Sequence, residues 1–193
     1  MAKSVGPRGS ARARVIEAAL ALFAEHGVNG TSLQMIADHL GVSKASVYYQ
    51  FHSKDDIVLA VIRPVFADLD QLATEIETKE EGPARKAAAI AGFVELAVRH
   101  RRVTAVFYRD PAIDTLVNSN EECSAINLRL RKVLGMDGAD TETRVTMSLV
   151  TSGIYGSAMD PELQDIPDDE LHRHLLQAAR RLLPLEERDA IRR

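Results

Sequence analysis

Residues that crosslink or stiffen a chain are scarce in this sequence. Cys123 is the single cysteine among 193 residues, so no intrachain disulfide can form and nothing in the cysteine usage indicates an oxidising compartment. Tryptophan is absent, and aromatic residues make up 5% of the chain. The longest uninterrupted apolar run covers residues 87–94, far below the roughly 18 residues of a membrane-spanning helix. We therefore expect neither a disulfide scaffold nor an integral membrane protein.

Motifs of enzymes and metal sites are also lacking. The sequence holds no Ser, His and Asp grouping, no glycine-rich phosphate loop and no paired-carboxylate motif. His172 and His174 lie two residues apart, whereas two metal ligands on one helix face prefer a spacing of three or four. We expect Cys123 to be a buried structural thiol. No catalytic residue, metal or cofactor is predicted.

Positive charge gathers near the start of the chain. The whole sequence has a net charge of −4, yet residues 1–54 carry six Lys and Arg against three acidic residues. That is a net charge of +3 in this segment, which leaves −7 for the rest. A basic head on an acidic body is expected when only the head approaches a polyanion such as nucleic acid. A basic tail that merely improves solubility explains the same charges equally well.

The first apolar stretch, residues 15–24, follows basic residues and superficially resembles a secretion signal. Glu17 interrupts the stretch, and its apolar residues recur at helical spacing. We therefore expect an amphipathic first helix and a cytoplasmic protein.

Helical periodicity without an alternating strand predicts an all-α fold. Gly27 should end the first helix and Gly41 the second, because glycine readily adopts the conformation that follows a helix. Pro64 should kink or break the helix that starts at residue 54. Later helices are predicted from Pro83 to a bend at residues 100–102, over 103–109, after Pro111, from a Ser119 cap to Leu134, and over 141–159 and 168–183.

Residues 31–51 read as a helix, a glycine turn and a second helix. Ala37 and Val42 pack with Val47 where the two helices cross, and Phe51 joins Val47 in the core. The second helix presents a polar face that fits the major groove of DNA, made of Lys44, Ser46, Tyr48, Tyr49 and Gln50. A generic three-helix packing unit has the same periodicity, so that alternative stays open here.

Three segments in this region carry a more specific pattern. They are Ala24-Glu-His-Gly-Val-Asn-Gly-Thr-Ser-Leu, Ile36-Ala-Asp-His-Leu-Gly-Val-Ser and Ser46-Val-Tyr-Tyr-Gln-Phe-His-Ser-Lys-Asp-Asp-Ile57. Together they resemble the TetR-type bacterial transcriptional regulators over about the first quarter of the chain. The resemblance implies a homodimer whose two heads enter successive major grooves of a palindromic operator, with half-sites about 34 to 36 Å apart. It also implies an effector pocket in each body.

The resemblance assigns DNA contacts residue by residue. Thr31 and Gln34 would contact DNA from the first helix of the motif, and Tyr48 and Lys54 would hold phosphates. The side chains facing the groove would be those of Lys44, Ser46 and Tyr49. Ala45 stands where the family often has glycine, and Gln50 stands where histidine or another polar residue is frequent, which leaves the base preference open.

Candidate pocket residues in the body combine apolar and amide side chains. Leu116, Asn120, Cys123, Asn127 and Leu130 fall on one helical stripe, where buried amides need partners from a ligand or from neighbouring backbone. Further candidate walls, each of which core packing alone would also explain, are Phe66, Phe93, Phe107, Tyr108 and Met147. We expect a mostly apolar effector.

Small residues in the second-last helix predict a dimer interface, because they let two backbones approach closely. They are Ser152, Gly153, Gly156 and Ser157. The last helix offers a matching apolar stripe of Leu171, Leu175, Ala178 and Leu182. Two such helices from each chain would form a four-helix bundle about a two-fold axis.

The sequence thus predicts a three-helix DNA-binding head, residues 1–54, and a larger helical body for effector binding and dimerisation, residues 55–193. The predicted function is that of a ligand-responsive transcriptional repressor, without enzymatic activity, that binds double-stranded operator DNA as a homodimer. Two alternatives remain: a helical small-molecule-binding protein without operator binding, and a transcriptional activator. The polar side chains of Lys44, Ser46 and Gln50 argue against the first.

Overall fold

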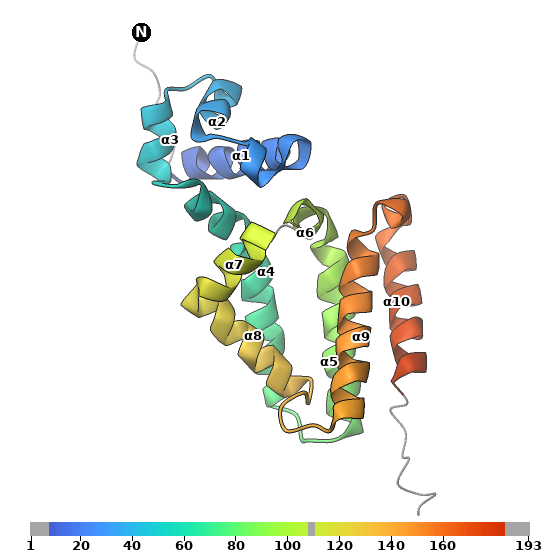
Figure 1. Cartoon of the computed structure of the whole chain (residues 1–193). Helices are drawn as coiled ribbons and strands as arrows, with labels where there is room; N and C mark the ends of the chain where they lie inside the picture. Colours follow the sequence, from blue (N-terminus) through green and yellow to red (C-terminus); the bar gives the residue numbers. More distant parts are fainter. Residues whose placement is uncertain (1–7, 108–110, 184–193) are drawn as a thin grey trace, which may run out of the picture. The chain divides into compact units, whose positions relative to one another are not determined.

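The computed structural model describes residues 8–107 and 111–183, and the regular structure in these residues is helical throughout, as predicted. Figure 1 shows the helices with their labels. Their bounds are α1 Arg8–Gly30, α2 Leu33–Leu40, α3 Lys44–Gln50, α4 Lys54–Glu77, α5 Pro83–Arg99, α6 Arg101–Phe107, α7 Pro111–Ser119, α8 Glu121–Val133, α9 Thr141–Met159, a short 3-10 helix η1 Pro161–Leu163, and α10 Asp168–Leu182.

Local signals fix most of the helix ends. Gly27 has φ 72° and ψ 165°, so it interrupts α1 at the predicted place, and the chain turns over the next three residues. Ser43 caps α3, and Pro83 is the first residue of α5. The predicted cap of α8 is wrong by one residue: Asn120 rather than Ser119 accepts the hydrogen bond, at 3.0 Å from the Cys123 N–H.

Pro64 does not break its helix. α4 continues through Pro64 from Lys54 to Glu77, although proline cannot donate the hydrogen bond to the carbonyl of Ala60. The helix therefore passes as one element through the point where the chain divides into two compact units.

The first unit, called the head below, comprises the described residues up to Pro64 and those between Val106 and Leu116. The second unit, called the body, comprises Val65–Ala105 and the described residues from Val117 onward. The head extends past residue 54 because Ile57 and Val58, in α4, are fully buried. It includes the end of α6 because the Phe107 ring packs edge-on against Phe23 of α1, with 6.1 Å between ring centroids.

The head core is made where α1, α2 and α3 cross. Val47 and Phe51 are buried in it, as predicted, together with Phe23, Ile36 and Ala37. These side chains lie on the inner faces of α1, α2 and α3 and, for Phe51, directly after α3, so burial of their apolar surface holds α3 in place.

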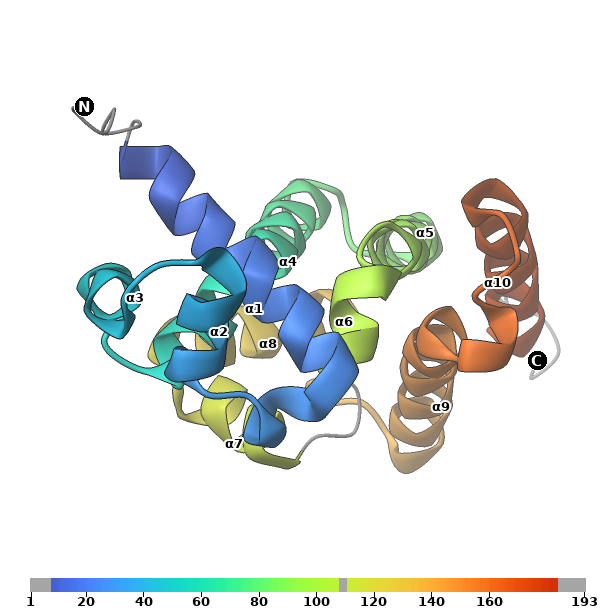
Figure 2. The same cartoon turned by 90° about the horizontal axis from the view of Figure 1, so that it is seen from above.

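The body is organised around α5, α9 and α10, which lie side by side in both views (Figures 1 and 2). α4 and α8 add side chains such as Leu69 and Leu130 to the same core. Gly92 of α5 permits a close approach of α4, because a Cβ atom at this position would lie 2.3 Å from Leu72 Cδ1. None of the helices in the described residues combines the length and the apolar character needed to cross a membrane.

Ion pairs tie α4 to its neighbours in the body. Arg129 of α8 bonds Asp70 and Thr74, and it pairs with Glu77 at 2.7 Å. Asp68 Oδ2 lies 2.8 Å from His100 Nε2 and 3.2 Å from Arg99 Nη1. The hydrogen bond from His100, together with the one from Arg99, lowers the pKa of the Asp68 carboxyl below its ordinary value.

We expect Asp68 to contribute to acid unfolding. A lowered folded-state pKa means that this stabilisation is present above the unfolded pKa of about 3.9 and is lost as the pH falls through the folded value. The Asp68→Asn variant should therefore be less stable than the parent near neutral pH, and the difference should shrink below about pH 4. Urea unfolding across this pH range measures both.

The matched control is Asp165→Asn, which removes an exposed carboxylate that makes no ion pair with the residues the structure describes. A stability difference for Asp68→Asn that stays constant from neutral to acid pH would contradict the role given to the Asp68 carboxylate.

Candidate DNA-binding site

The turn between α2 and α3 is built from local hydrogen bonds. Ser32 caps α2 by accepting from the Met35 N–H at 3.2 Å. Gly41 ends α2 in the left-handed region, with φ 64° and ψ 35°, and its N–H donates to Asp38 O at 3.1 Å. The next N–H, of Val42, donates to Ala37 O at 3.0 Å. A residue with a Cβ would be strained at Gly41, so glycine sets the angle at which α3 leaves the turn.

α3 buries one face and exposes the other. Its cap is Ser43, whose Oγ accepts from the Ser46 N–H at 3.2 Å and lies 2.9 Å from Ser46 Oγ. Val47 is buried, while Lys44, Ser46 and Tyr49 are exposed. The predicted polar face is therefore accessible along the whole short helix.

Tyr48 and Tyr49 are both exposed, but only Tyr48 has an aromatic neighbour. Its ring meets His52 edge-on at 5.2 Å between centroids. This contact orients Tyr48 along the end of α3 and leaves the Tyr49 ring free to point outward.

Arg12 of α1 holds the other end of α3. Its Nη1 donates to Gln50 O at 2.8 Å, and its guanidinium carbon lies 4.0 Å from the centroid of the Phe51 ring. A cation at the last carbonyl of a helix also suits the helix dipole. The sequence does not predict this role of Arg12, because no local pattern shows that α1 reaches the end of α3.

Thr31 corrects the prediction made for it. The side chain is 3% exposed, and its hydroxyl lies 2.8 Å from Gly27 O and 3.2 Å from Leu22 O. Thr31 therefore ties the interrupted end of α1 to the start of α2 rather than presenting its side chain to DNA. Its burial follows from the turn at Gly27, which folds Thr31 back onto α1.

Lys54 is half-buried and partly used inside the head. Its Nζ donates to Val28 O at 2.6 Å and to Thr31 O at 3.2 Å, which leaves one of the three ammonium N–H groups for a phosphate. Gln34 is exposed on α2, where its Nε2 donates to Asp38 Oδ1 at 2.7 Å. The predicted contact residues that remain accessible on the head are Gln34, Lys44, Ser46, Tyr48 and Tyr49.

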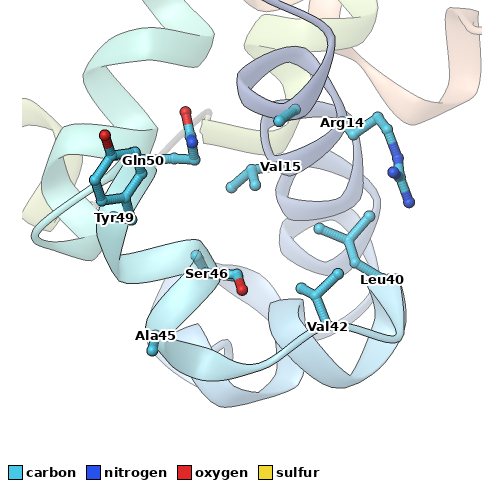
Figure 3. A pocket seen from close by; sticks show the side chains of 10 residues that line it. Arg14, Val15, Leu40, Val42, Ala45, Ser46, Tyr49 and Gln50 are labelled. Carbon is cyan, nitrogen blue, oxygen red and sulfur yellow. The ribbon is translucent and has the colours of Figure 1, made fainter. Parts of the chain in front are cut away.

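A hollow of about 460 Å³ lies beside this face (Figure 3). In the close view, Val15 of α1 with Leu40 and Val42 lies on one side, and Ser46 and Gln50 of α3 lie on the other. Its lining is mostly apolar, and Arg14 stands at its edge.

Comparison with known proteins matches this part of the chain to a family. The model of the bacterial regulatory proteins, tetR family, matches residues 15–61, which run from within α1 to the first turns of α4. By this match, residues 15–61 are of the TetR type. The resemblance seen in the tyrosine pair and in the segment around Gly41 is thereby confirmed.

Relatives of this chain include the HTH-type transcriptional repressor KstR2 of Mycobacterium tuberculosis, strain H37Rv, with 29% identity over 112 residues. The match covers 58% of this chain and 56% of KstR2, so the chain spans about half the length of the curated relatives it matches.

Solved structures show the same fold. That of the ketosteroid transcriptional regulator KstR2 of M. tuberculosis has a TM-score of 0.67 at 22% identity and covers 95% of this chain and 96% of that one. The transcriptional regulator FadR of Bacillus subtilis, in complex with stearoyl-CoA, has a TM-score of 0.61 at 18% identity and covers 86% of this chain and 96% of that one.

The body places the predicted dimer residues on different faces. Ser152 and Gly153 of α9 are exposed, and Gly156 and Ser157 are half-buried. On α10, Ala178 and Leu182 are exposed. Leu171 and Leu175 correct the prediction: they are buried in the core of their own chain, together with Ala179. A partner chain therefore cannot reach them without repacking the body.

The predicted pocket residues are likewise dispersed. Phe93 and Met147 belong to the body core, Cys123 is buried, and Phe66, Leu116 and Asn127 are half-buried. Phe107 corrects the prediction because its ring packs in the head, and Asn120 uses its carbonyl to cap α8. Tyr108 lies outside the described residues. A hollow of about 640 Å³ in the body is lined by none of the predicted set; Arg131, Met136, Thr141, Arg144, Val145, Ser148, Leu149 and Ser152 line it.

Proposed function

We propose that this TetR-family protein is a homodimeric transcriptional repressor that binds a palindromic operator through its head. A mostly apolar small molecule, bound in the body, would release it. The observation that carries the proposal is the exposed polar face of α3, which the Ser43 cap and the Arg12 contact hold at its two ends. Occupying promoter DNA is sufficient for repression.

The distribution of charge supports the orientation of this complex. Residues 1–54 carry a net charge of +3, whereas the rest of the chain carries −7. The phosphate backbone attracts the head and repels the body, so DNA approaches α3 rather than another face. We assign DNA binding to residues 1–54 and effector binding and dimerisation to residues 55–193.

The nature of the effector is supported by fold likeness and by the body core. KstR2 is named a repressor, and FadR was solved with stearoyl-CoA, whose acyl chain is apolar. Small-molecule sites in helical bundles lie between helices and are lined mostly by apolar side chains, which suits such a chain. The half-buried Phe66 and Asn127, both in the body, remain the predicted lining, whereas Leu116 belongs to the head.

Selection from a pool of random duplex DNA tests the proposal directly, because it requires no knowledge of the effector. Bound sequences are recovered at about 50 mM and about 200 mM salt. A palindrome enriched at both concentrations supports the repressor. Binding that is sequence-blind and lost at the higher salt would favour the alternative, a helical small-molecule-binding protein without an operator.

Two lysines of the head should behave differently in this assay. Lys44→Ala removes an exposed side chain at the start of α3 and should relax the preference at one base position. Lys54→Ala should weaken binding to all duplexes about equally and reduce the salt slope by about one, since it removes one phosphate contact. Titrations of the selected duplex and of a scrambled duplex at several salt concentrations measure both quantities. If both variants changed base preference and salt slope equally, the assignment of Lys44 as a base contact and of Lys54 as a phosphate contact would be wrong.

A further inference from the structure

The start of α3 exposes two side chains that cannot form hydrogen bonds. Val42 directly precedes the cap residue Ser43, and Ala45 lies in the first turn of α3. Val42 is 38% exposed, and Ala45 is also exposed. In helix-turn-helix proteins the amino-terminal residues of this helix contact base edges. Both apolar side chains therefore stand where bases are read.

The polar groups beside them are already partly satisfied. Ser43 Oγ accepts from the Ser46 N–H at 3.2 Å and lies 2.9 Å from Ser46 Oγ, so the two hydroxyls share a hydrogen bond. This sharing reduces the hydrogen-bonding capacity that the first turn of α3 offers to a base. Beside the charged side chain of Lys44, this end of the helix therefore offers apolar contact from Val42 and Ala45.

Both side chains line the hollow of about 460 Å³ beside α3, together with the apolar Val15, Leu40 and Val47 (Figure 3). The charged residue in its lining is Arg14, a cation. The cation of Arg14 suits the phosphates of DNA, and the apolar lining of the hollow suits an apolar group on a base. Of the groups that bases present in the major groove, the 5-methyl of thymine is the apolar one.

We propose that Val42 and Ala45 read the 5-methyl group of a thymine in each operator half-site. The inference rests on the proposed function and deepens it, because it assigns a base class to a position of an unknown operator. Contact with a methyl group requires apolar surface and no donor or acceptor, and these two side chains supply such surface.

Replacing thymine by uracil tests the proposal, because uracil lacks the methyl group and keeps the oxygens. The duplex selected from the random pool is resynthesised with deoxyuridine at one thymidine position per half-site at a time. At the position that is read, the parent protein should bind the uracil duplex about three- to fivefold more weakly per methyl group buried. The thymine-to-uracil affinity ratio should fall toward one in Val42→Ala and in Ala45→Gly.

The matched control is Leu128→Ala, which truncates an apolar side chain that is 60% exposed on α8 of the body. It should keep the ratio of the parent protein, and thermal unfolding checks that every variant is folded. A ratio of one at all positions of the parent duplex, or a raised ratio that survives in both head variants, would overturn the inference. A selection that enriches no sequence would instead overturn the proposed function, and this inference with it.

Discussion

Replacing Arg101 with alanine should lower the free energy of unfolding by roughly 3 kcal/mol, because two backbone carbonyls would lose their donor and a cavity would form. Arg101 is the first residue of α6 and is only 3% exposed. Its Nη2 donates to Ile166 O at 2.8 Å and also contacts Asp168 Oδ1 at 2.8 Å, while Nη1 donates to Leu163 O at 3.3 Å. One guanidinium thus fixes the connection between α9 and α10.

The neighbouring arginine provides a matched control. Arg102 carries the same charge and is the next residue of α6, but its side chain is exposed. Arg102→Ala should therefore change the free energy of unfolding by no more than about 0.5 kcal/mol. Arg101→Lys should recover only part of the loss, since an ammonium lacks the planar fork that reaches both carbonyls. Urea unfolding of the three variants measures the differences. Equal losses for Arg101→Ala and Arg102→Ala would show that the buried contacts contribute nothing.

The role of Arg101 illustrates what sequence patterns do not contain. The pattern predicts a bend at residues 100–102, and the structure has one between α5 and α6. The carbonyl groups that Arg101 binds, those of Leu163 and Ile166, lie more than sixty residues away along the chain. The contacts of Arg12 and Thr31 were not predicted for the same reason, because they depend on how the helices cross. By contrast, the ends set by Gly41 and Ser43 were predicted, since each depends on hydrogen bonds within a few residues.

The last helix shows a smaller version of this limit. The sequence predicted an apolar stripe of Leu171, Leu175, Ala178 and Leu182, which are separated by four, three and four residues. In the structure the third buried residue of α10 is Ala179, not Ala178. Both patterns fit a helical period, and packing against α5 and α9 decides which one is buried. The residues that line a pocket are harder still to predict, because the sequence pattern around a buried residue such as Phe93 is the same whether the side chain contacts a neighbouring residue or a ligand.

The exposed face of α9 supports the proposed homodimer. Val145 and Leu149 are 62% and 61% exposed, and Gly153 follows at the same spacing of four residues. Residues four apart lie on one side of a helix, so this face presents apolar surface that ends at a glycine. A contiguous exposed apolar patch, rather than a single exposed apolar side chain, is typical of an interaction surface. We propose that this face, together with the exposed Ala178 and Leu182 of α10, is the surface offered to a partner chain, because Leu171 and Leu175 are buried.

Gly153→Leu should convert the dimer to a monomer and weaken operator binding at least about a hundredfold, because two linked heads bind far more tightly than one. The single chain tolerates the change: a Cβ atom at Gly153 would meet no atom within 4 Å, and glycine is itself unfavourable inside a helix by about 1 kcal/mol. The monomer should therefore melt as a folded protein while light scattering reports half the mass. Ala125→Leu, which adds the same side chain at an exposed position of α8, should leave the mass and the affinity unchanged. A Gly153→Leu protein that stays dimeric would place the interface elsewhere.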